Sequence, residues 1–208
     1  MNGSYHFVHL LAKVAPPGVT ANVYNLSGTI VFSGGGAFTF AGRMGSGANN
    51  PVPLTGNGVY SVSPSGYVLL DNPNPNAANV KIDARLGDEG EILVGSSSRA
   101  TDGSIDFFVA LRAPSAVGNS VLSGDYTGGT LGFLNASQAG LASALLTFSS
   151  EGGGAIPKVG VFGHAVDVAG DRSFSEEILN VPYTIYTDGT GTAKFGSDFG
   201  GGSGPTRL

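Results

Sequence analysis

Turn-forming residues are spread through the whole chain and leave only short segments between them. Gly accounts for 35 and Pro for 11 of the 208 residues. Clusters of Gly, Pro, Asn and Asp recur between segments that are rich in Val, Ile, Phe and Tyr. Such short segments are typical of β-strands joined by tight turns, and helical periodicity is almost absent. The sequence therefore predicts an all-β protein.

The clearest strand candidate covers residues 80–86, where apolar and charged side chains alternate. Successive side chains of a strand point to opposite faces, so this alternation predicts a sheet with one face in the core and one in water. The expected inward set is Val80, Ile82, Ala84 and Leu86, and the expected outward set is Lys81, Asp83 and Arg85.

Residues 1–113 contain about eight strand candidates in succession, joined by short turns. Eight sequential antiparallel strands is the number found in small closed meander barrels. A sandwich stays open as an alternative, because a sequence does not choose between closing a sheet and folding it over. The expected fold is therefore an antiparallel meander barrel or a sandwich.

The pattern of residues 1–113 starts again after a linker predicted at 114–121. Tyr5 recurs as Tyr126, the glycine triplet at 34–36 recurs at 152–154, and Tyr60 recurs as Tyr183, at offsets of 121, 118 and 123. Matches in one order at nearly one offset indicate an internal repeat. The second unit, residues 122–208, is shorter, and we expect it to stand beside the first or to pack with it as one domain. It lacks recognisable counterparts of Tyr67–Leu70, Val80–Leu86, Glu91–Ser96 and Ile105–Arg112.

An incomplete second copy would leave a sheet edge open. Five strands of a meander cannot close an eight-stranded barrel, and an open edge exposes unpaired N–H and C=O groups. We expect the edge near Tyr183–Phe195 to be paired by a strand from elsewhere in the chain or from another subunit. Self-association through this edge is the partner interaction that the sequence suggests.

Charge and composition exclude several function classes. Charged residues make up only 12% of the chain and the net charge is −5. Lys and Arg occur singly, so no basic cluster indicates nucleic-acid binding. No apolar run approaches the 18 residues of a membrane helix. The chain has no Cys, which excludes disulfides, thiolate metal sites and cysteine nucleophiles.

Residues that could ligate a metal do not form a recognisable site. His6 and His9 are three apart on a predicted strand, so they should face opposite sides and share no metal. The loop from Asp71 to Asn76 and the pair Asp167 and Asp171 offer oxygen ligands, but neither follows the EF-hand order. A Ca²⁺ site is kept as a minor alternative, and no other cofactor is expected.

No catalytic motif stands out. There is no Gly-x-Ser-x-Gly elbow, and the glycine triplets are better explained as hairpin turns than as phosphate loops. Carboxylate pairs such as Asp102 with Asp106 lie next to turns, where solvated side chains are expected. We therefore assign no catalytic residue.

Aromatic residues of the first unit are the remaining candidates for a site. In a small barrel such side chains fill the interior, and in a wider one they line a ligand pocket. The candidates for core or pocket lining are Tyr5, Phe7, Phe38, Phe40, Tyr60, Tyr67, Phe107 and Phe108.

Several sequence motifs of the chain resemble those of secreted repeat proteins of soil acidobacteria. They are L-x-G-x-Y at 122–126, the aromatic strands around a Gly-rich turn at 32–40, G-x-Y-x-V at 58–62, and LVGSSS with DFFVALRAP within 93–114. The resemblance implies an extracellular or cell-surface β module of bacterial origin and transfers no catalytic residue. No signal peptide is recognisable, because Met1 leads directly into a strand pattern.

Three functions are compatible with these observations. The first is a non-enzymatic extracellular module for structure, adhesion or assembly. The second is a lipocalin-like or avidin-like binder of a small apolar ligand. The third is a barrel enzyme of dirigent-like or cyclase-like shape, which would work through an apolar cavity with few polar groups.

Overall fold

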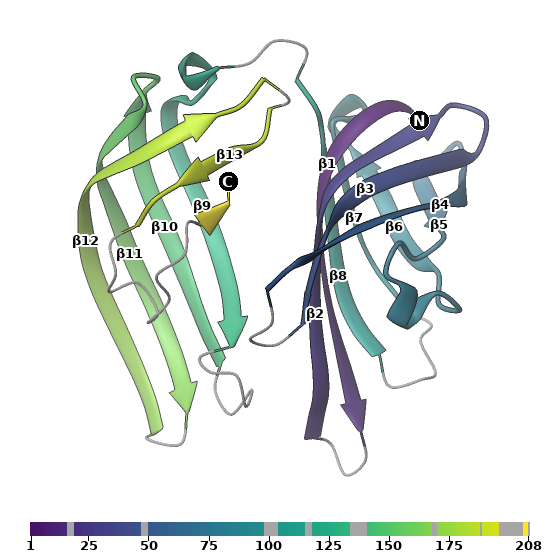
Figure 1. The fold of residues 1–208 in the computed structure, drawn as a ribbon, viewed down its shortest axis with the longest axis horizontal. Helices are drawn as coiled ribbons and strands as arrows, with labels where there is room; N and C mark the ends of the chain where they lie inside the picture. Colours follow the sequence, from purple (N-terminus) through teal and green to yellow (C-terminus); the bar gives the residue numbers. More distant parts are fainter. Residues whose placement is uncertain are drawn as a thin grey trace. The chain divides into compact units, whose positions relative to one another are not determined.

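The computed structural model divides the chain into two compact units, Met1–Ala113 and Pro114–Leu208, which are described separately (Figure 1). The structure describes residues 1–15, 19–46, 50–97, 104–114, 118–133, 141–167, 170–187, 189–195 and 206–207.

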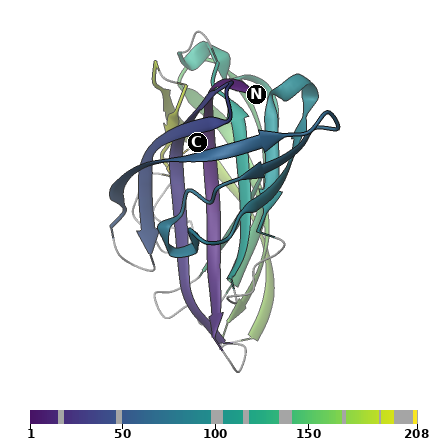
Figure 2. The same cartoon turned by 90° about the vertical axis from the view of Figure 1, so that its right-hand side faces the viewer.

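The first unit is a closed antiparallel barrel whose eight strands follow one another in chain order. The barrel closes where β8 pairs with β1, from Tyr5 opposite Arg112 to Lys13 opposite Ser104. This pairing decides between the two predicted architectures, because a sheet closed on itself has no free edge. Figure 2 shows the barrel wall with β1 and β2 running side by side. The strands are β1 (Asn2–Ala15), β2 (Val19–Ser33), β3 (Ala37–Ser46), β4 (Val52–Val62), β5 (Tyr67–Leu70), β6 (Ile82–Gly87), β7 (Ile92–Ser96) and β8 (Ser104–Arg112).

Side-chain alternation in β6 follows the predicted pattern. Ile82 and Ala84 are buried in the barrel, whereas Arg85 is exposed. The strand begins at Ile82, two residues later than predicted, so Val80 lies before it and is half-buried. The segment between β5 and β6 instead contains a short 3₁₀ helix, η1 (Pro75–Ala77), and a second one, η2 (Asp88–Gly90), follows β6.

The second unit is an open, curled sheet with the strand order β14-β13-β12-β11-β10-β9. Its apolar core gathers Ile156, Val159, Val161, Val181, Tyr183 and Ala193. The sheet resembles half of a barrel, and its four long strands are consecutive hairpin partners. The strands are β9 (Ser123–Phe133), β10 (Leu141–Glu151), β11 (Ala155–Asp167), β12 (Gly170–Ile185), β13 (Gly191–Ala193) and β14 (Thr206–Arg207).

Residues 118–121 of the predicted linker are docked onto the second unit. Asn119–Val121 form the short 3₁₀ helix η3. The side-chain oxygen of Asn119 accepts a hydrogen bond from the N–H of Ile185 at 2.8 Å, and its carbonyl accepts one from the hydroxyl of Tyr183 at 3.1 Å. This part of the segment is therefore held by side-chain and backbone contacts; residues 115–117 lie outside the described residues.

The glycine triplets form the same hairpin turn in both units. Gly34 and Gly36 have φ angles of 79° and 93°, and Gly152 and Gly154 have 78° and 89°. Only glycine adopts this left-handed conformation without strain, which explains the triplet between β2 and β3 and between β10 and β11.

Backbone contacts around the triplets also correspond. The N–H of Tyr60 donates to Gly36 O at 2.8 Å, and the N–H of Tyr183 donates to Gly154 O at 2.9 Å. Tyr60 pairs with Leu70 across β4 and β5, as Tyr183 pairs with Ala193 across β12 and β13. The β9–β13 order thus follows the β1–β5 order. The expectation that Tyr67–Leu70 has no counterpart was wrong, because the short strand β13 takes the place of β5.

The edge predicted to need cover, near Tyr183–Phe195, is paired within the chain. Tyr183–Ile185 pair with β13, and Thr192 and Ala193 of β13 pair with β14 near the C-terminus. Among the described residues, the longer open edges of this sheet lie elsewhere, on β9 and on the part of β12 before Tyr183.

Candidate functional site

Most of the aromatic residues predicted to line the barrel do so. Their rings form two contacting groups in the interior, which together we call the aromatic column. The Phe32 ring lies 5.3 Å from the Tyr5 ring and 4.9 Å from the Tyr60 ring, and the Phe7 ring lies 5.7 Å from the Phe108 ring, all measured between ring centroids. Rings at these distances are in van der Waals contact. The buried members of the predicted set are Tyr5, Phe7, Phe38, Phe40, Tyr60 and Phe108, and sequence reasoning missed Phe32.

Tyr67 and Phe107 do not line the interior. Phe108 stands opposite His9 inside the barrel, so the alternation turns its neighbour Phe107 outward, where 55% of the residue is exposed. Val68 takes the inward position of β5, and Tyr67 therefore lies on the outer face, where its hydroxyl bonds to Asp83.

Two glycines of β4 make room for the aromatic column. A Cβ atom at Gly58 would lie 2.5 Å from the Phe38 ring, and one at Gly56 would lie 2.6 Å from the Phe40 ring. These distances are far below van der Waals contact, so the rings occupy the space that side chains on β4 would fill. The barrel interior is thus packed as a core.

Below this column lies a buried polar cluster, which we define as His9, Asn72, Asn74, Ser97 and Asp106. The side chains of His9 and Asp106 are completely buried, and Nε2 of His9 donates to Oδ2 of Asp106 at 2.8 Å. Asn72 Nδ2 donates to the same oxygen at 3.2 Å, and Ser97 Oγ donates to it at 2.6 Å. The Ser97 N–H bonds to the other oxygen. Asp106 therefore accepts bonds from three different chain segments.

The hydrogen bonds of this cluster stabilise the ionised side chain of Asp106. Burial alone would raise the pKa of Asp106, but the hydrogen bonds from His9 and Ser97 outweigh it and hold this pKa below its usual value. Ser97 donates to Asp106 and not to His9, so it is not arranged as a nucleophile activated by a base. His9 Nδ1 and Asn74 Nδ2 are buried and have no hydrogen-bond partner among the described residues.

Asp106 corrects one expectation and His9 confirms another. Asp106 was expected to be solvated beside a turn, but it faces the interior because it shares the inward phase of Phe108. His6 and His9 face opposite sides of β1, as predicted: His6 Nδ1 lies 3.3 Å from Thr29 Oγ1, whereas His9 is inside. Asp102, the other member of the predicted pair, lies outside the described residues.

A second group of polar contacts, around Tyr5 and Arg112, lies toward the opposite end of the barrel. The Tyr5 hydroxyl donates to Gly90 O at 2.7 Å and accepts a bond from Arg112 Nη2 at 2.9 Å. Arg112 also pairs with Glu91, with 2.8 Å between Nε and Oε1. These contacts join the first strand, the turn before β7 and the end of β8, which is where the barrel closes.

Apolar side chains form a stripe on the outside of the barrel, on two neighbouring strands. Val8 of β1 is 58% exposed and Ile105 of β8 is 64% exposed, and Phe107 and Leu111 share the outer phase of β8. Contiguous exposed apolar surface of this kind marks interaction sites more often than isolated residues do. The stripe was not predicted, since both Phe107 and Phe108 were taken as candidates for the interior and no outer face was assigned to this strand.

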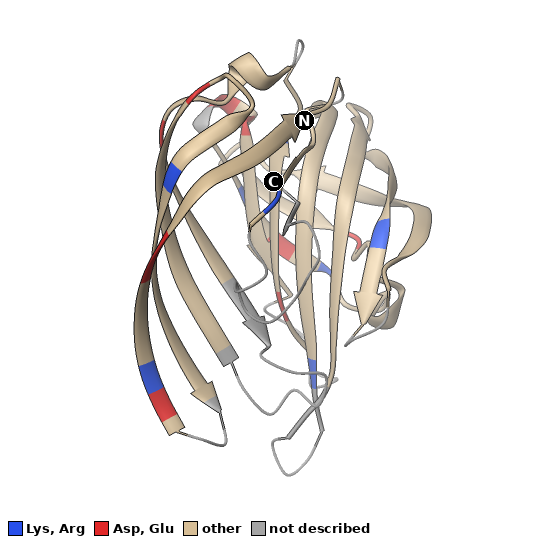
Figure 3. Cartoon of the chain, turned by 60° about the vertical axis from the view of Figure 1, so that its left-hand side comes forward, with Lys and Arg blue, Asp and Glu red and all other residues tan. Residues whose placement is uncertain are grey.

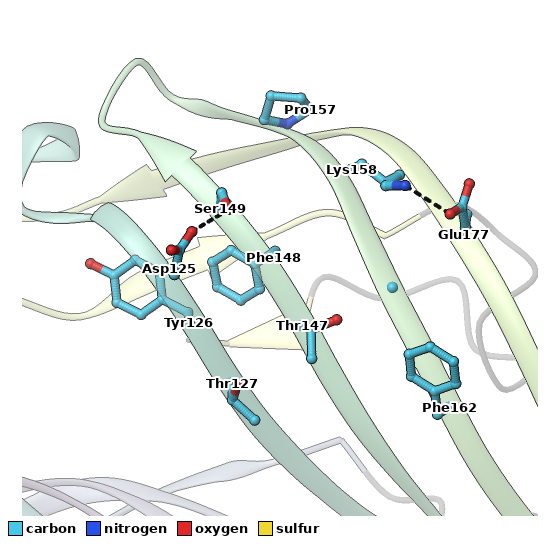
Figure 4. Close-up of a pocket in the computed structure, with 11 residues that line it drawn as sticks. Asp125, Tyr126, Thr127, Thr147, Phe148, Ser149, Pro157, Lys158, Phe162 and Glu177 are labelled. Carbon is cyan, nitrogen blue, oxygen red and sulfur yellow. Dashed lines mark hydrogen bonds and ion pairs between the residues drawn. The ribbon is translucent and has the colours of Figure 1, made fainter.

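The second unit carries a shallow depression on one face of β9–β12, of about 610 Å³ (Figure 4). Phe162 is exposed beside it, Lys158 Nζ pairs with Glu177 Oε1 at 2.8 Å, and Ser149 bonds to Asp125. The polar groups of this depression are thus satisfied by one another. A similar depression lies over β2–β4 of the first unit, lined in part by Asn57.

The open edges of the second sheet are its most unusual feature. β9 is the last strand of the sheet and pairs only with β10 in the described residues. On β12, β13 covers only Tyr183–Ile185, which leaves the stretch from Ser173 to Val181 at an edge in the part of the chain described here. We refer to β9 and Ser173–Val181 as the two open edges.

Charged groups and metal ligands do not concentrate anywhere in the described residues. Lys, Arg, Asp and Glu are scattered over both units (Figure 3). No group of three or more His, Asp or Glu side chains has the arrangement of a metal site in the described ranges. The described residues also contain no helix with the length and apolarity needed to span a membrane.

Comparisons with protein-family models, with curated proteins and with solved structures found no match to this chain. The geometry above is therefore the basis for the functional proposal.

Proposed function

We propose that this protein is a non-enzymatic extracellular module for assembly or adhesion, and that it works by accepting a β-strand at the open edges of its second unit. The observation that carries the proposal is the open half-barrel, in which β9 and Ser173–Val181 lie at edges that no other described strand covers, beside an apolar core. Such an edge is a template for strand addition, in which main-chain hydrogen bonds supply affinity.

The packing of the first unit supports this proposal over the binding of a small ligand. A lipocalin-like or avidin-like binder needs a cavity in the barrel. Here the Phe32 ring contacts the rings of Tyr5 and Tyr60, and the Phe7 ring contacts that of Phe108, inside the barrel. The same packing argues against a cyclase-like enzyme, which needs that space for its substrate.

The match between the two units identifies what the second one lacks. We infer that β9–β13 repeat the β1–β5 pattern, because the turns and backbone contacts correspond at each glycine triplet and each paired tyrosine. In the first unit the edge of β1 is covered by β8. The counterpart of that edge in the second unit is β9. The extracellular location rests on the sequence resemblance and on the low charge.

The test is whether the open edge accepts the strand that the repeat predicts. A labelled peptide with the sequence of β8, Ser104–Arg112, with lysines added for solubility, is titrated into the full chain, and a scrambled peptide is the control. We expect saturable binding of the first peptide only, with slower amide hydrogen exchange in β9. Equal affinity for both peptides, or no binding by a chain that is monomeric under the same conditions, would contradict strand addition.

A hydrophobic fluorophore provides the complementary experiment. If the protein binds small apolar ligands inside the barrel, the dye should bind at one site per chain. Phe108→Ala, which changes the barrel interior, should then alter the affinity for the dye. We expect no stoichiometric dye binding to the first unit, because its interior is filled by side chains.

A further inference from the structure

The first tyrosine of each unit has a different set of partners. Tyr5 bonds to Gly90 and Arg112, which belong to the closing part of the barrel. Tyr126, at the corresponding place on β9, is 5.2 Å from the Phe148 ring, and its hydroxyl bonds back to the carbonyls of Val121 and Ser123, each at 3.3 Å. The second unit therefore has the tyrosine of the closing edge without the strands that close it in the first.

The direction of the strands determines what can fill this place. β9, β10, β11 and β12 are consecutive antiparallel partners, so β9 and β12 run in opposite directions. A second sheet of the same four strands, related by a two-fold axis parallel to the strands, presents its β12 antiparallel to β9 and its β9 antiparallel to β12. Both seams then have the normal antiparallel polarity.

We propose that a second copy of this chain fills the half-barrel, with β9 of each copy paired to Ser173–Val181 of the other. This inference rests on the proposed strand addition and names its occupant. Four long strands from each copy give eight, which is the number that closes the first unit. The two-fold arrangement uses both open edges at once, so it ends in a closed dimer rather than a filament.

The dimensions and the faces of the edges fit each other. β9 has 11 residues, and the edge from Ser173 to Val181 spans most of the neighbouring length of β12. Tyr126 stands opposite Phe148, and Phe148, Ile178 and Val181 belong to or pack against the apolar core of the sheet. Closure would therefore extend the apolar core of each copy with side chains of the other, around Phe148 and Ile178, which are only partly buried in one chain.

The mass of the full chain in solution is the first measurement. Sedimentation equilibrium should give a species of twice 20.8 kDa that dissociates on dilution. The second measurement locates the contact by disulfide cross-linking, which is specific here because the chain contains no Cys.

Register within the sheet provides the positions for cross-linking. Thr127 stands opposite Thr147, Thr147 opposite Gly160, and Gly160 opposite Glu177, so Thr127 and Glu177 are level on one face. Three strand spacings separate them within one copy, about 14 Å, which exceeds the Cα separation of about 4.4–6.8 Å that a disulfide tolerates. A disulfide between these strands therefore joins two copies.

Because closure of a barrel staggers neighbouring strands, the register between β9 and β12 of the two copies is tested with cysteines at several positions of β12. Copies carrying Thr127→Cys are mixed in turn with copies carrying Ser173→Cys, Ser175→Cys or Glu177→Cys and are oxidised mildly. We expect a cross-linked dimer from at least one mixture, and no dimer from any variant alone. Thr39→Cys, exposed on β3 of the barrel, is the matched control and should not cross-link with Glu177→Cys.

The outcomes separate the two proposals. A chain that stays monomeric at all concentrations but binds the β8 peptide retains strand addition and overturns the second copy as occupant. Efficient cross-linking of Thr127→Cys with itself would also overturn it, because that result requires β9 to pair with β9. A monomer that binds neither the peptide nor a second copy rejects both proposals.

Discussion

His9 and Asp106 form a completely buried pair, with 2.8 Å between Nε2 and Oδ2, at residues 97 positions apart in the chain. The pair joins the first and the last strand of the barrel, since His9 is on β1 and Asp106 is on β8. It also receives Asn72 from the segment that follows β5. One carboxylate thus holds together the seam of the barrel and the segment beside it.

The first prediction concerns the contribution of this pair to the free energy of unfolding of the protein. Asp106→Asn replaces the carboxylate while keeping its shape, and it leaves buried donors of His9 and Ser97 without their charged acceptor. We expect a loss of about 3–5 kcal/mol, measured by urea denaturation, as for breaking one side of a buried pair. The control is Asp171→Asn, which breaks the exposed pair with His164 (3.0 Å) and should cost at most about 1 kcal/mol. Equal losses of stability in the two variants would contradict the claim that the buried pair stabilises the protein more than an exposed one.

The second prediction is the pH dependence of the same contact. The pKa of Asp106 is lower in the folded protein than its value of about 3.9 in an unfolded chain. The carboxylate therefore stabilises the fold above pH 4, and this contribution is lost as the pH falls through the folded pKa. The stability difference between the wild type and Asp106→Asn should shrink as the pH falls below about 4. A difference that stays constant over this range would contradict the assignment of a charged Asp106.

The third prediction uses the two adjacent phenylalanines of β8. Phe108→Ala removes a ring from the core and should lower the free energy of unfolding by about 3–5 kcal/mol. Phe107→Ala removes a ring from the outer face and should cost about 1 kcal/mol or less. Thermal unfolding of both variants measures the difference. Similar shifts in melting temperature would contradict the assignment of Phe108 to the interior and of Phe107 to the outer face.

The fourth prediction tests the space that glycine provides for the aromatic column. Gly58→Ala places a methyl group 2.5 Å from the Phe38 ring and should destabilise the barrel by about 1–3 kcal/mol. Gly128→Ala, on β9, is the matched control, because a Cβ atom there meets nothing within 4 Å. We expect the control to change stability by no more than about 0.5 kcal/mol. The double variant Gly58→Ala with Phe38→Leu should recover part of the loss, which a strain unrelated to the ring would not allow.

The strand-and-turn pattern was sufficient to predict the class of the fold. Turn residues and alternation are local properties, so about eight strands in residues 1–113 could be expected before any contact was known. Glycine triplets at 34–36 and 152–154 marked hairpins because left-handed φ angles are a property of the residue itself.

The candidate site was less predictable, because it depends on which face of a strand becomes the interior. On β8 one phase carries Ile105, Phe107 and Leu111, and the other carries Asp106 and Phe108. Hydrophobicity alone favours the first phase, but the barrel buries the second, since Asp106 finds His9, Ser97 and Asn72 there. The polar partners come from distant parts of the chain, and no local pattern indicates them.

The sequence by itself determined the β class, the short strands, the positions of the turns and the recurrence of the opening pattern, because each depends on residues close together in the chain. Only the tertiary structure decided that the first unit closes into a barrel and that the second remains open. It also decided that a buried Asp–His pair lies at the seam. These features depend on pairing between strands as distant as β1 and β8, where closure requires every strand to be present. In the second unit the described strands form a sheet that does not close, with β9 at its edge.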